Sequence, residues 1–279
     1  VMRLDLDTLD LSVFASGLRN PCGISFDRDW HLFANDNDQE GSTANPCRLV
    51  QVPANSWNGW ARGWESTQNP KRLDMLPTTN WELDVPVGQG YYDHAAFGGR
   101  YAGSLFVANW GSRSVDRYPL RANGAGFKAT SESFFQAEGL RRPVSAMPTN
   151  DGSLLVSLCY MNGNEGSPKR PTDLVRISPR EQNGVAAYDH SQTSLIDLLS
   201  GAVQLRAKAH REIFRRGGDE LKTAASAFQT TAPDHPAFSS LIFLAAAQGD
   251  AASVDRIRVL TKESGRVGAL AWRAAAAYP

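Results

Sequence analysis

One stretch of the sequence occurs twice, and this repeat limits the fold more than any other feature of the chain. Residues 17–38, GLRNPCGISFDRDWHLFANDND, align without a gap with residues 139–160, GLRRPVSAMPTNDGSLLVSLCY. Each copy has a proline before a short strand-like run, then a polar turn, then a second apolar run. The repeat therefore predicts a fold built from copies of one small antiparallel unit.

Further strand-like runs complete each copy. LVQV at residues 49–52 closes the first copy, LVRI at 174–177 closes the second, and a related unit, YAGSLFVANWGSRSVDRYPL, occupies residues 101–120. Units of a few short antiparallel strands that recur every ~40–50 residues are typical of propeller blades. We predict a partial β-propeller of about three blades, with the remaining blades upstream of Val1 because three are too few to close a ring.

The spacing between the first and second units is longer than the next spacing. The excess falls in residues 57–99, which we interpret as a loop inserted on the binding face. Indole side chains crowd this segment and would either stack a sugar or form the loop's own small core, which we favour; they are Trp57, Trp60, Trp64 and Trp81. His94, next to Asp93, is a candidate base, although single exposed loop histidines are more often inert.

The composition changes near residue 190. The later residues are rich in Ala, Leu and Arg and are divided by Gly and Pro, which predicts a series of short helices. Paired helices in series indicate an α-solenoid, and a compact helical bundle is the alternative. We therefore predict two domains, a partial propeller over residues 1–182 and a helical domain over residues 191–279.

Charge and motifs exclude several classes of protein. The 29 basic and 29 acidic residues cancel, so no overall field favours a nucleic acid. The apolar run at residues 241–247 is too short to span a bilayer, and no phosphate-binding loop or nucleophile elbow follows a strand. No signal peptide is visible, and a chain that opens on Val1 in mid-pattern is interpreted as an excerpt of a longer protein.

The three cysteines form no C-x-x-C pair, which argues against a zinc knuckle or a c-type haem attachment within these residues. Cys22 and Cys159 fall in strand-like positions, where buried, inert thiols are expected. A disulfide between Cys22 and Cys47 stays open, because the sequence alone does not set the distance between them.

Acidic and amide side chains gather at the end of the first copy, in NDNDQEG at residues 35–41. The run imitates the start of an EF-hand loop, but its twelfth position is Cys47 rather than a glutamate and no flanking helices are evident. A hard-cation site that uses Asp36, Asp38 and a few carbonyls is the metal hypothesis. The alternative is a solvated, Asx-rich turn at a strand end.

Arg19 and Asn20 stand just before the first strand of the same copy. Pro21 favours an extended conformation at Asn20, which would aim both side chains at a central channel. An arginine beside an asparagine offers a fork of donors to a carboxylate-bearing ligand. A polar pair that ties neighbouring blades together is the alternative. In the second copy the arginine recurs as Arg141, and Arg142 replaces the asparagine.

The order of these motifs resembles the soluble glucose/sorbosone dehydrogenase family, whose members are six-bladed propellers that use pyrroloquinoline quinone (PQQ) with calcium. The shared pattern is G-x-R-N-P, a strand, a polar cluster, a closing strand and Gly-Trp pairs, here at residues 59–60 and 63–64. The resemblance covers residues 3–178. LRAKAHREIFRRGG, at residues 205–218, resembles HEAT repeats. A propeller of this kind followed by HEAT repeats is similar to large exported proteins of planctomycete-type bacteria, which often end in a haem-binding cytochrome c domain.

The resemblance implies roles for individual residues. Arg19 and Asn20 match the family's pair that faces cofactor and substrate, and Arg19 would be the catalytic member that polarises. Asn37 falls where the family has a cofactor-contacting glutamine, and Asp38 falls where main-chain oxygens hold calcium. Arg142 matches an arginine that contacts the cofactor from a late blade. The family's catalytic histidine would lie upstream of Val1.

The implied activity is oxidation of a sugar or other alcohol with calcium-bound PQQ, in a protein that is periplasmic or secreted. A cytochrome c could accept the electrons, and haem c would belong to a domain outside this chain. The alternative is a propeller and solenoid that bind a ligand or a protein without chemistry.

Overall fold

The protein is described by a computed structural model that covers residues 1–6, 8–37, 47–59, 78–80, 84–160, 172–180 and 193–278. The chain divides into two compact units. The first consists of Val1–Asp27 and His31–Val185, and the second of Arg28–Trp30 and Ala186–Pro279. The predicted domain boundary, between residues 182 and 191, lies outside the described residues.

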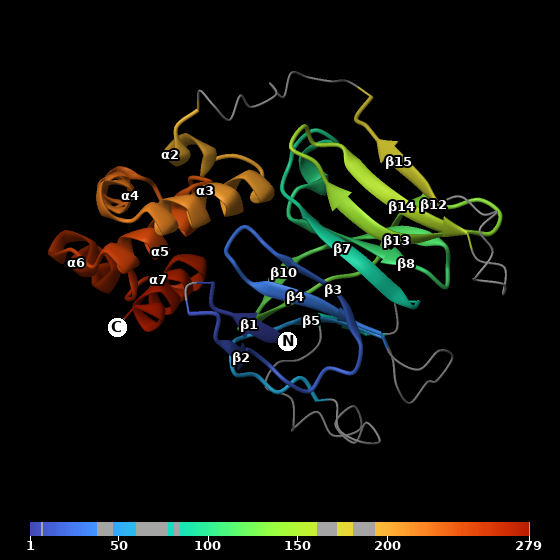
Figure 1. The fold of residues 1–279 in the computed structure, drawn as a ribbon, viewed down its shortest axis with the longest axis horizontal. Coiled ribbons are helices and arrows are strands. Elements are labelled where there is room, and N and C mark those ends of the chain that lie inside the picture. Colours follow the sequence, from blue (N-terminus) through green and yellow to red (C-terminus); the bar gives the residue numbers. More distant parts are fainter. Residues whose placement is uncertain are drawn as a thin grey trace. The chain divides into compact units, whose positions relative to one another are not determined.

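The first unit contains three larger antiparallel sheets (Figure 1). Sheet 1 has the order β3 (Pro21–Phe26), β4 (Leu32–Asp36), β5 (Arg48–Gln51) and β6 (Thr79–Asn80). Sheet 2 has the order β7 (Pro86–Tyr92), β8 (Ser104–Asn109), β9 (Ser114–Pro119) and β12 (Glu132–Gln136). Sheet 3 has the order β13 (Arg141–Pro148), β14 (Leu154–Tyr160) and β15 (Asp173–Ile177).

Short elements accompany these sheets. One hairpin joins β1 (Met2–Leu4) and β2 (Leu11–Val13), and a second joins β10 (Arg121–Asn123) and β11 (Gly126–Lys128). A 3₁₀ turn, η2 (Gly99–Tyr101), precedes β8.

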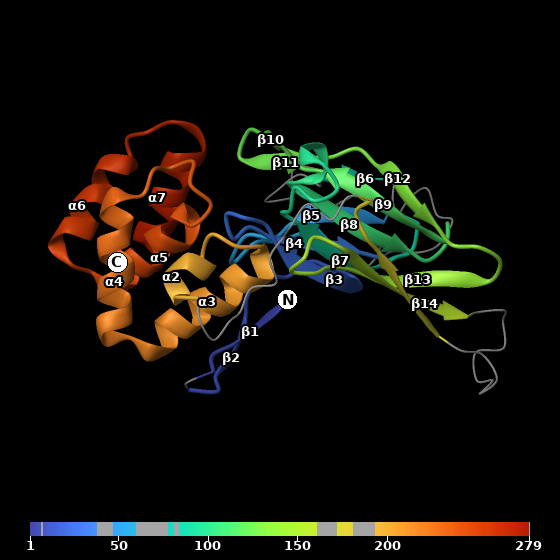
Figure 2. The same ribbon diagram turned by 90° about the horizontal axis from the view of Figure 1, so that it is seen from above.

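The first strands of the three sheets lie side by side, since β7 packs against β3 on one side and β13 on the other (Figure 2). Glycines make this close approach feasible. A Cβ added at Gly23 would lie 2.6 Å from the Val87 carbonyl oxygen, and one at Gly88 would lie 2.7 Å from that of Val144. Successive sheets packed through their first strands form a sector of a β-propeller, which confirms the predicted partial propeller.

The repeat is confirmed as a structural repeat. Residues 17–38 supply β3 and β4, and residues 139–160 supply β13 and β14, the first two strands of separate sheets. In both copies the register shifts just after the proline, between Pro21 and Gly23 and between Pro143 and Ser145. Each bulge adds one residue to the first strand at the same place in the blade.

The interpretation of residues 57–99 as one inserted loop is wrong for part of that segment. Pro86–Tyr92 is β7, the first strand of sheet 2, whose next two strands come from residues 101–120. The sequence PVGQGYY lacks a run of β-branched residues because its two glycines, Gly88 and Gly90, face β13, where a side chain would not fit. Trp57 is half-buried, whereas the other three tryptophans of the segment lie outside the described residues.

The cores of the first unit follow the strand faces. A buried cluster joins sheets 2 and 3 and includes Tyr92, Phe106 and Val156. The Tyr92 hydroxyl donates to the Gly152 carbonyl at 2.8 Å, so the hydrogen bond links β7 to the β13–β14 turn. A second cluster lies on sheet 1 and is partly covered by the N-terminal segment through Phe14.

The second unit contains helices, as the composition predicts. Their order is α2 (Leu195–Leu198), α3 (Val203–Arg216), α4 (Gly218–Thr230), α5 (Phe238–Gln248), α6 (Ala251–Leu260) and α7 (Gly265–Ala277). Ser194 and Asp250 cap α2 and α6 by accepting backbone N–H bonds, and Gly249 ends α5 in a left-handed conformation. Within the described residues, no helix is both long enough and apolar enough to span a bilayer.

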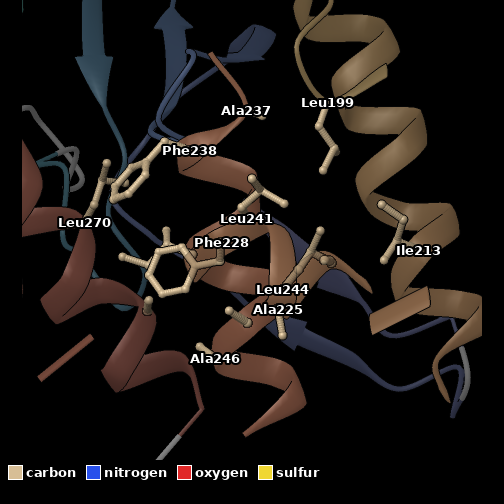
Figure 3. Close-up of a cluster of buried hydrophobic side chains, with 14 of the residues drawn as sticks. Leu199, Ile213, Ala225, Phe228, Ala237, Phe238, Leu241, Leu244, Ala246 and Leu270 are labelled. Carbon is tan, nitrogen blue, oxygen red and sulfur yellow. The ribbon is translucent and has the colours of Figure 1, made fainter. Parts of the chain in front are cut away.

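Helix α5 is the centre of the helical core (Figure 3). It is buried on most of its surface and contacts α3, α4, α6 and α7. Phe228 of α4 and Phe238 of α5 pack together with Leu241 and Leu270. Contacts between sequence neighbours and second neighbours arise both in a solenoid and in a small bundle, so the solenoid stays a prediction.

Candidate functional site

Asp36 organises the segment that carries Arg19 and Asn20, the pair predicted to face a cofactor. Asp36 is fully buried at the end of β4. Its Oδ1 accepts the backbone N–H groups of Arg19 at 3.0 Å and Asn20 at 2.9 Å. The carboxylate therefore fixes the backbone that carries both side chains.

The other oxygen of Asp36 belongs to a buried ion pair. Arg48 Nη2 donates to Asp36 Oδ2 at 2.5 Å, and Arg48 Nη1 donates to the Asn58 carbonyl at 2.7 Å. Both side chains are almost completely shielded, with exposed fractions of 0% for Asp36 and 1% for Arg48. A charge pair taken out of water needs hydrogen bonds in place of its hydration, and the contacts of Asp36 Oδ1, Asp36 Oδ2, Arg48 Nη1 and Arg48 Nη2 replace part of it.

This anchor brings the three predicted residues together. Arg19 Nη1 donates to the Asn37 carbonyl at 3.2 Å, and the Asn37 N–H donates to the Asn20 carbonyl at 3.1 Å. Arg19 and Asn20 are exposed, and Asn37 is half-buried. Exposed side chains on a backbone held by buried contacts are preorganised, which lowers the ordering cost of binding any ligand that reaches them.

Thiols lie beside the same residues. The Cys47 thiol donates to Asn37 Oδ1 at 3.7 Å, and the Cys22 thiol donates to the Asn20 carbonyl at 3.4 Å. Burial raises the pKa of Cys22, and the Asp36 carboxylate raises it further, whereas a hydrogen bond with Asn37 acts in the opposite direction.

The disulfide that the sequence left open is absent, since neither Cys22 nor Cys47 forms a disulfide. Pro21 and Arg48 pair with Asp36 from opposite sides. Strand β4 therefore lies between β3, which contains Cys22, and β5, which begins directly after Cys47. The strands β3 and β5 are two strand spacings, or roughly 10 Å, apart. A disulfide requires Cα atoms within about 7 Å of each other.

A polar network that the sequence analysis missed joins sheets 1 and 2. The buried Asn35 side chain accepts the Gly23 N–H at 3.0 Å and donates to the Val87 carbonyl at 2.8 Å. Gln89 donates to Ser25 Oγ and to a main-chain carbonyl of β4, both at 3.0 Å. Polar residues inside the apolar runs LFAND and PVGQGYY were the available signal.

Arg142 ties sheet 3 to sheet 2. Its Nη1 donates to the carbonyls of Trp110 at 2.7 Å and Gly111 at 3.1 Å, and its guanidinium lies 4.1 Å from the Trp110 ring centroid. These contacts are an interblade tie, the role that is the alternative for Arg19 and Asn20. The neighbouring Arg141 instead pairs with Asp173 at 2.6 Å.

The way the first strands pack places the Arg19–Asn37 cluster and the Arg142–Trp110 contact at the same end of the blades. Gly23 packs against Val87 and Gln89, and Gly88 packs against Val144 and Ser145. Residues three or four positions earlier in each strand therefore lie at a common end. We call this end the rim and define it by five residues: Arg19, Asn20, Asn37, Trp110 and Arg142.

The described residues supply no complete metal site, since none of the His, Cys, Asp and Glu side chains described form a group of three that could hold an ion. Both oxygens of Asp36 already accept hydrogen bonds. Asp38 lies outside the described residues. Calcium at Asp36 and Asp38 therefore stays a prediction.

His94, the candidate base, follows the far end of β7 and is not part of the rim. Its Nδ1 accepts the Ala96 N–H at 3.1 Å. Burial lowers the pKa of His94, whereas the carboxylates of Asp151 and Asp93 act in the opposite direction.

Comparison with known proteins gives structural neighbours alone. No protein-family model matches the chain, and no curated protein matches it.

Three similar solved structures have TM-scores below 0.5. The PQQ-bound aldose sugar dehydrogenase of Streptomyces coelicolor is 21% identical, with a TM-score of 0.43 over 60% of this chain and 45% of that one. The apo-form of the soluble aldose sugar dehydrogenase of Escherichia coli is 18% identical, with a TM-score of 0.45 over 60% and 47%. A putative oxidoreductase (glucose dehydrogenase) of Thermus thermophilus is 19% identical, with a TM-score of 0.41 over 58% and 46%. The chain spans about half the length of these proteins.

Proposed function

We propose that the strand unit takes part in oxidising a sugar or other alcohol with PQQ as the bound cofactor. The observation that carries the proposal is the rim, where the buried Asp36 holds Arg19 and Asn20 exposed beside Asn37. PQQ is a planar quinone with several carboxylates. Guanidinium and carboxamide donors on a rigid backbone are the groups that bind and orient such a molecule.

The polar residues of the rim would contact different parts of the cofactor. Arg19 would bind a carboxylate or polarise a carbonyl, and Asn20 and Asn37 would orient the ring system through their carboxamides. Arg142 would contribute N–H groups other than those that bind Trp110 and Gly111. When bound, the cofactor supplies the two-electron acceptor that amino-acid side chains lack.

The proposal also includes a metal, a repeat type, a location and an electron acceptor, which the described residues do not test. Calcium would be held through Asp38 and nearby carbonyls. The helical unit would be HEAT-like, the protein would be exported, and a cytochrome c would accept the electrons, with haem c outside this chain.

Titration with PQQ, followed by absorbance and by thermal unfolding, tests the proposal. We expect PQQ to raise the melting temperature and Arg19→Gln to weaken binding about tenfold, as expected for the loss of a charged hydrogen bond. Arg121→Gln is the control, because Arg121 is an exposed arginine of β10 and not a rim residue. Absence of PQQ binding by the folded protein would overturn the proposal and leave the binding-scaffold alternative.

A further inference from the structure

A cavity of about 790 Å³ opens at the end of the blades away from the rim. Its walls are the β7–β8 connection, Phe134 of β12 and residues 177–180, which begin at the last residue of β15. Strand β7 has seven residues. At a rise of about 3.3 Å per residue, the cavity lies roughly 20 Å from the rim. It is therefore separate from the proposed cofactor site, and its volume is that of a small-molecule pocket.

Aromatic rings form one wall of the cavity. Phe97, Tyr101 and Phe134 are half-buried and meet edge to face, with centroids 5.6 to 6.0 Å apart. Rings this close to one another leave no room for a cation between them. Their remaining surface suits the face or edge of a planar apolar group.

Positive charge surrounds this aromatic wall. The guanidinium groups of Arg100 and Arg117 lie 4.7 and 5.0 Å from the Tyr101 ring centroid. Arg180 lines the cavity and is exposed. Glu132, the carboxylate near these arginines, is paired with Arg117 at 2.6 Å. A cationic ligand is therefore disfavoured.

The polar lining supplies donors rather than carboxylates. Among the described residues, those that line the cavity include no Asp or Glu. His94 Nδ1 accepts the Ala96 N–H, so the neutral ring carries its proton on Nε2 and can donate. Asp151, near His94, already accepts hydrogen bonds from Thr149 and Ser153. The cavity thus combines an apolar aromatic wall with donors and a cation.

We propose that this cavity is a second binding site, specific for a small aromatic carboxylate. The ring of the ligand packs on Phe97, Tyr101 and Phe134, and its carboxylate pairs with Arg180. An arginine–carboxylate hydrogen bond supplies the charge selectivity, and the aromatic wall supplies the preference for a flat ligand. The site is independent of the proposed PQQ chemistry.

Saturation-transfer NMR on the whole chain tests the site with three probes. We expect 2-naphthoate to bind, and expect no binding from 2-naphthylmethylamine, which has the opposite charge, or from cyclohexanecarboxylate, which lacks the aromatic ring. Arg180→Gln should weaken 2-naphthoate binding about tenfold, the loss expected for a charge-assisted hydrogen bond.

Two matched variants separate this site from the rim. Arg121→Gln removes an exposed arginine elsewhere, and Arg19→Gln removes the rim arginine; both should leave 2-naphthoate binding unchanged. The proposal is overturned if 2-naphthoate does not bind at millimolar concentration, if the amine binds as well as the acid, or if Arg180→Gln behaves like Arg121→Gln. Loss of binding in Arg19→Gln would move the ligand to the rim and would also overturn it.

Discussion

The buried pair of Asp36 and Arg48 gives the sharpest prediction about the strand unit. Asp36→Asn keeps the size of the side chain and one carbonyl acceptor, but it removes the charge that faces Arg48 at 2.5 Å. The Arg48 guanidinium is then buried without a counter-charge. Removing one partner of such a pair destabilises a protein by about 3–5 kcal/mol, which is a large share of a total stability of about 5–15 kcal/mol.

A double-mutant cycle measures the coupling between the two side chains. Arg48→Met should cost a similar amount, because it leaves the Asp36 carboxylate buried with only the N–H groups of Arg19 and Asn20. The double variant removes both charges, so its cost should be smaller than the sum of the single costs by about 2 kcal/mol or more. Urea unfolding followed by tryptophan fluorescence measures each free energy of unfolding.

An exposed pair of the same kind is the control. Arg141 and Asp173 lie 2.6 Å apart, but their exposed fractions are 43% and 38%. Arg141→Gln should therefore cost about 1 kcal/mol or less. Additive effects of Asp36→Asn and Arg48→Met, or a cost no larger than that of Arg141→Gln, would refute the argument that burial makes this pair an anchor.

Three further predictions concern other parts of the chain. Burial lowers the pKa of His210 to about 4; the unfolded chain therefore binds a proton that the folded helical unit excludes, and stability should fall by about 3 kcal/mol between pH 6.5 and 4. Replacing His210 by Leu should flatten that pH dependence in thermal unfolding, and an unchanged profile would contradict the assignment. Gly88→Ala brings a methyl group within 2.7 Å of backbone atoms of β13 and should lower the free energy of unfolding in urea by about 1–3 kcal/mol. Gly99→Ala is the control and should be tolerated, because nothing lies within 4 Å of the added methyl group. Equal costs for the two variants would count against the packing of the first strands. Mild oxidation should leave Cys22 and Cys47 unlinked, and a peptide carrying that cross-link in mass spectrometry would show that β4 does not hold them apart.

Several features of the fold follow from local sequence. The matched residues 17–38 and 139–160 repeat a proline, a turn and two apolar runs, and each copy forms the same two strands with the same bulge. The strands before residue 180 and the helices of the Ala- and Leu-rich last part follow from backbone propensity, which acts over a few residues. Arg19, Asn20 and Asn37 are within reach of one another because a hairpin joins them, so their proximity was predictable.

Only the tertiary structure decided what surrounds these local units. Strand β7 was not recognised in the sequence because its glycines are required by close contact with β13, which is distant in sequence. The ion pair of Asp36 with Arg48 and the interblade contact of Arg142 with Trp110 also depend on which strands become neighbours. Side-chain partners of this kind are chosen by packing between sheets, whereas propensity and periodicity describe one strand at a time.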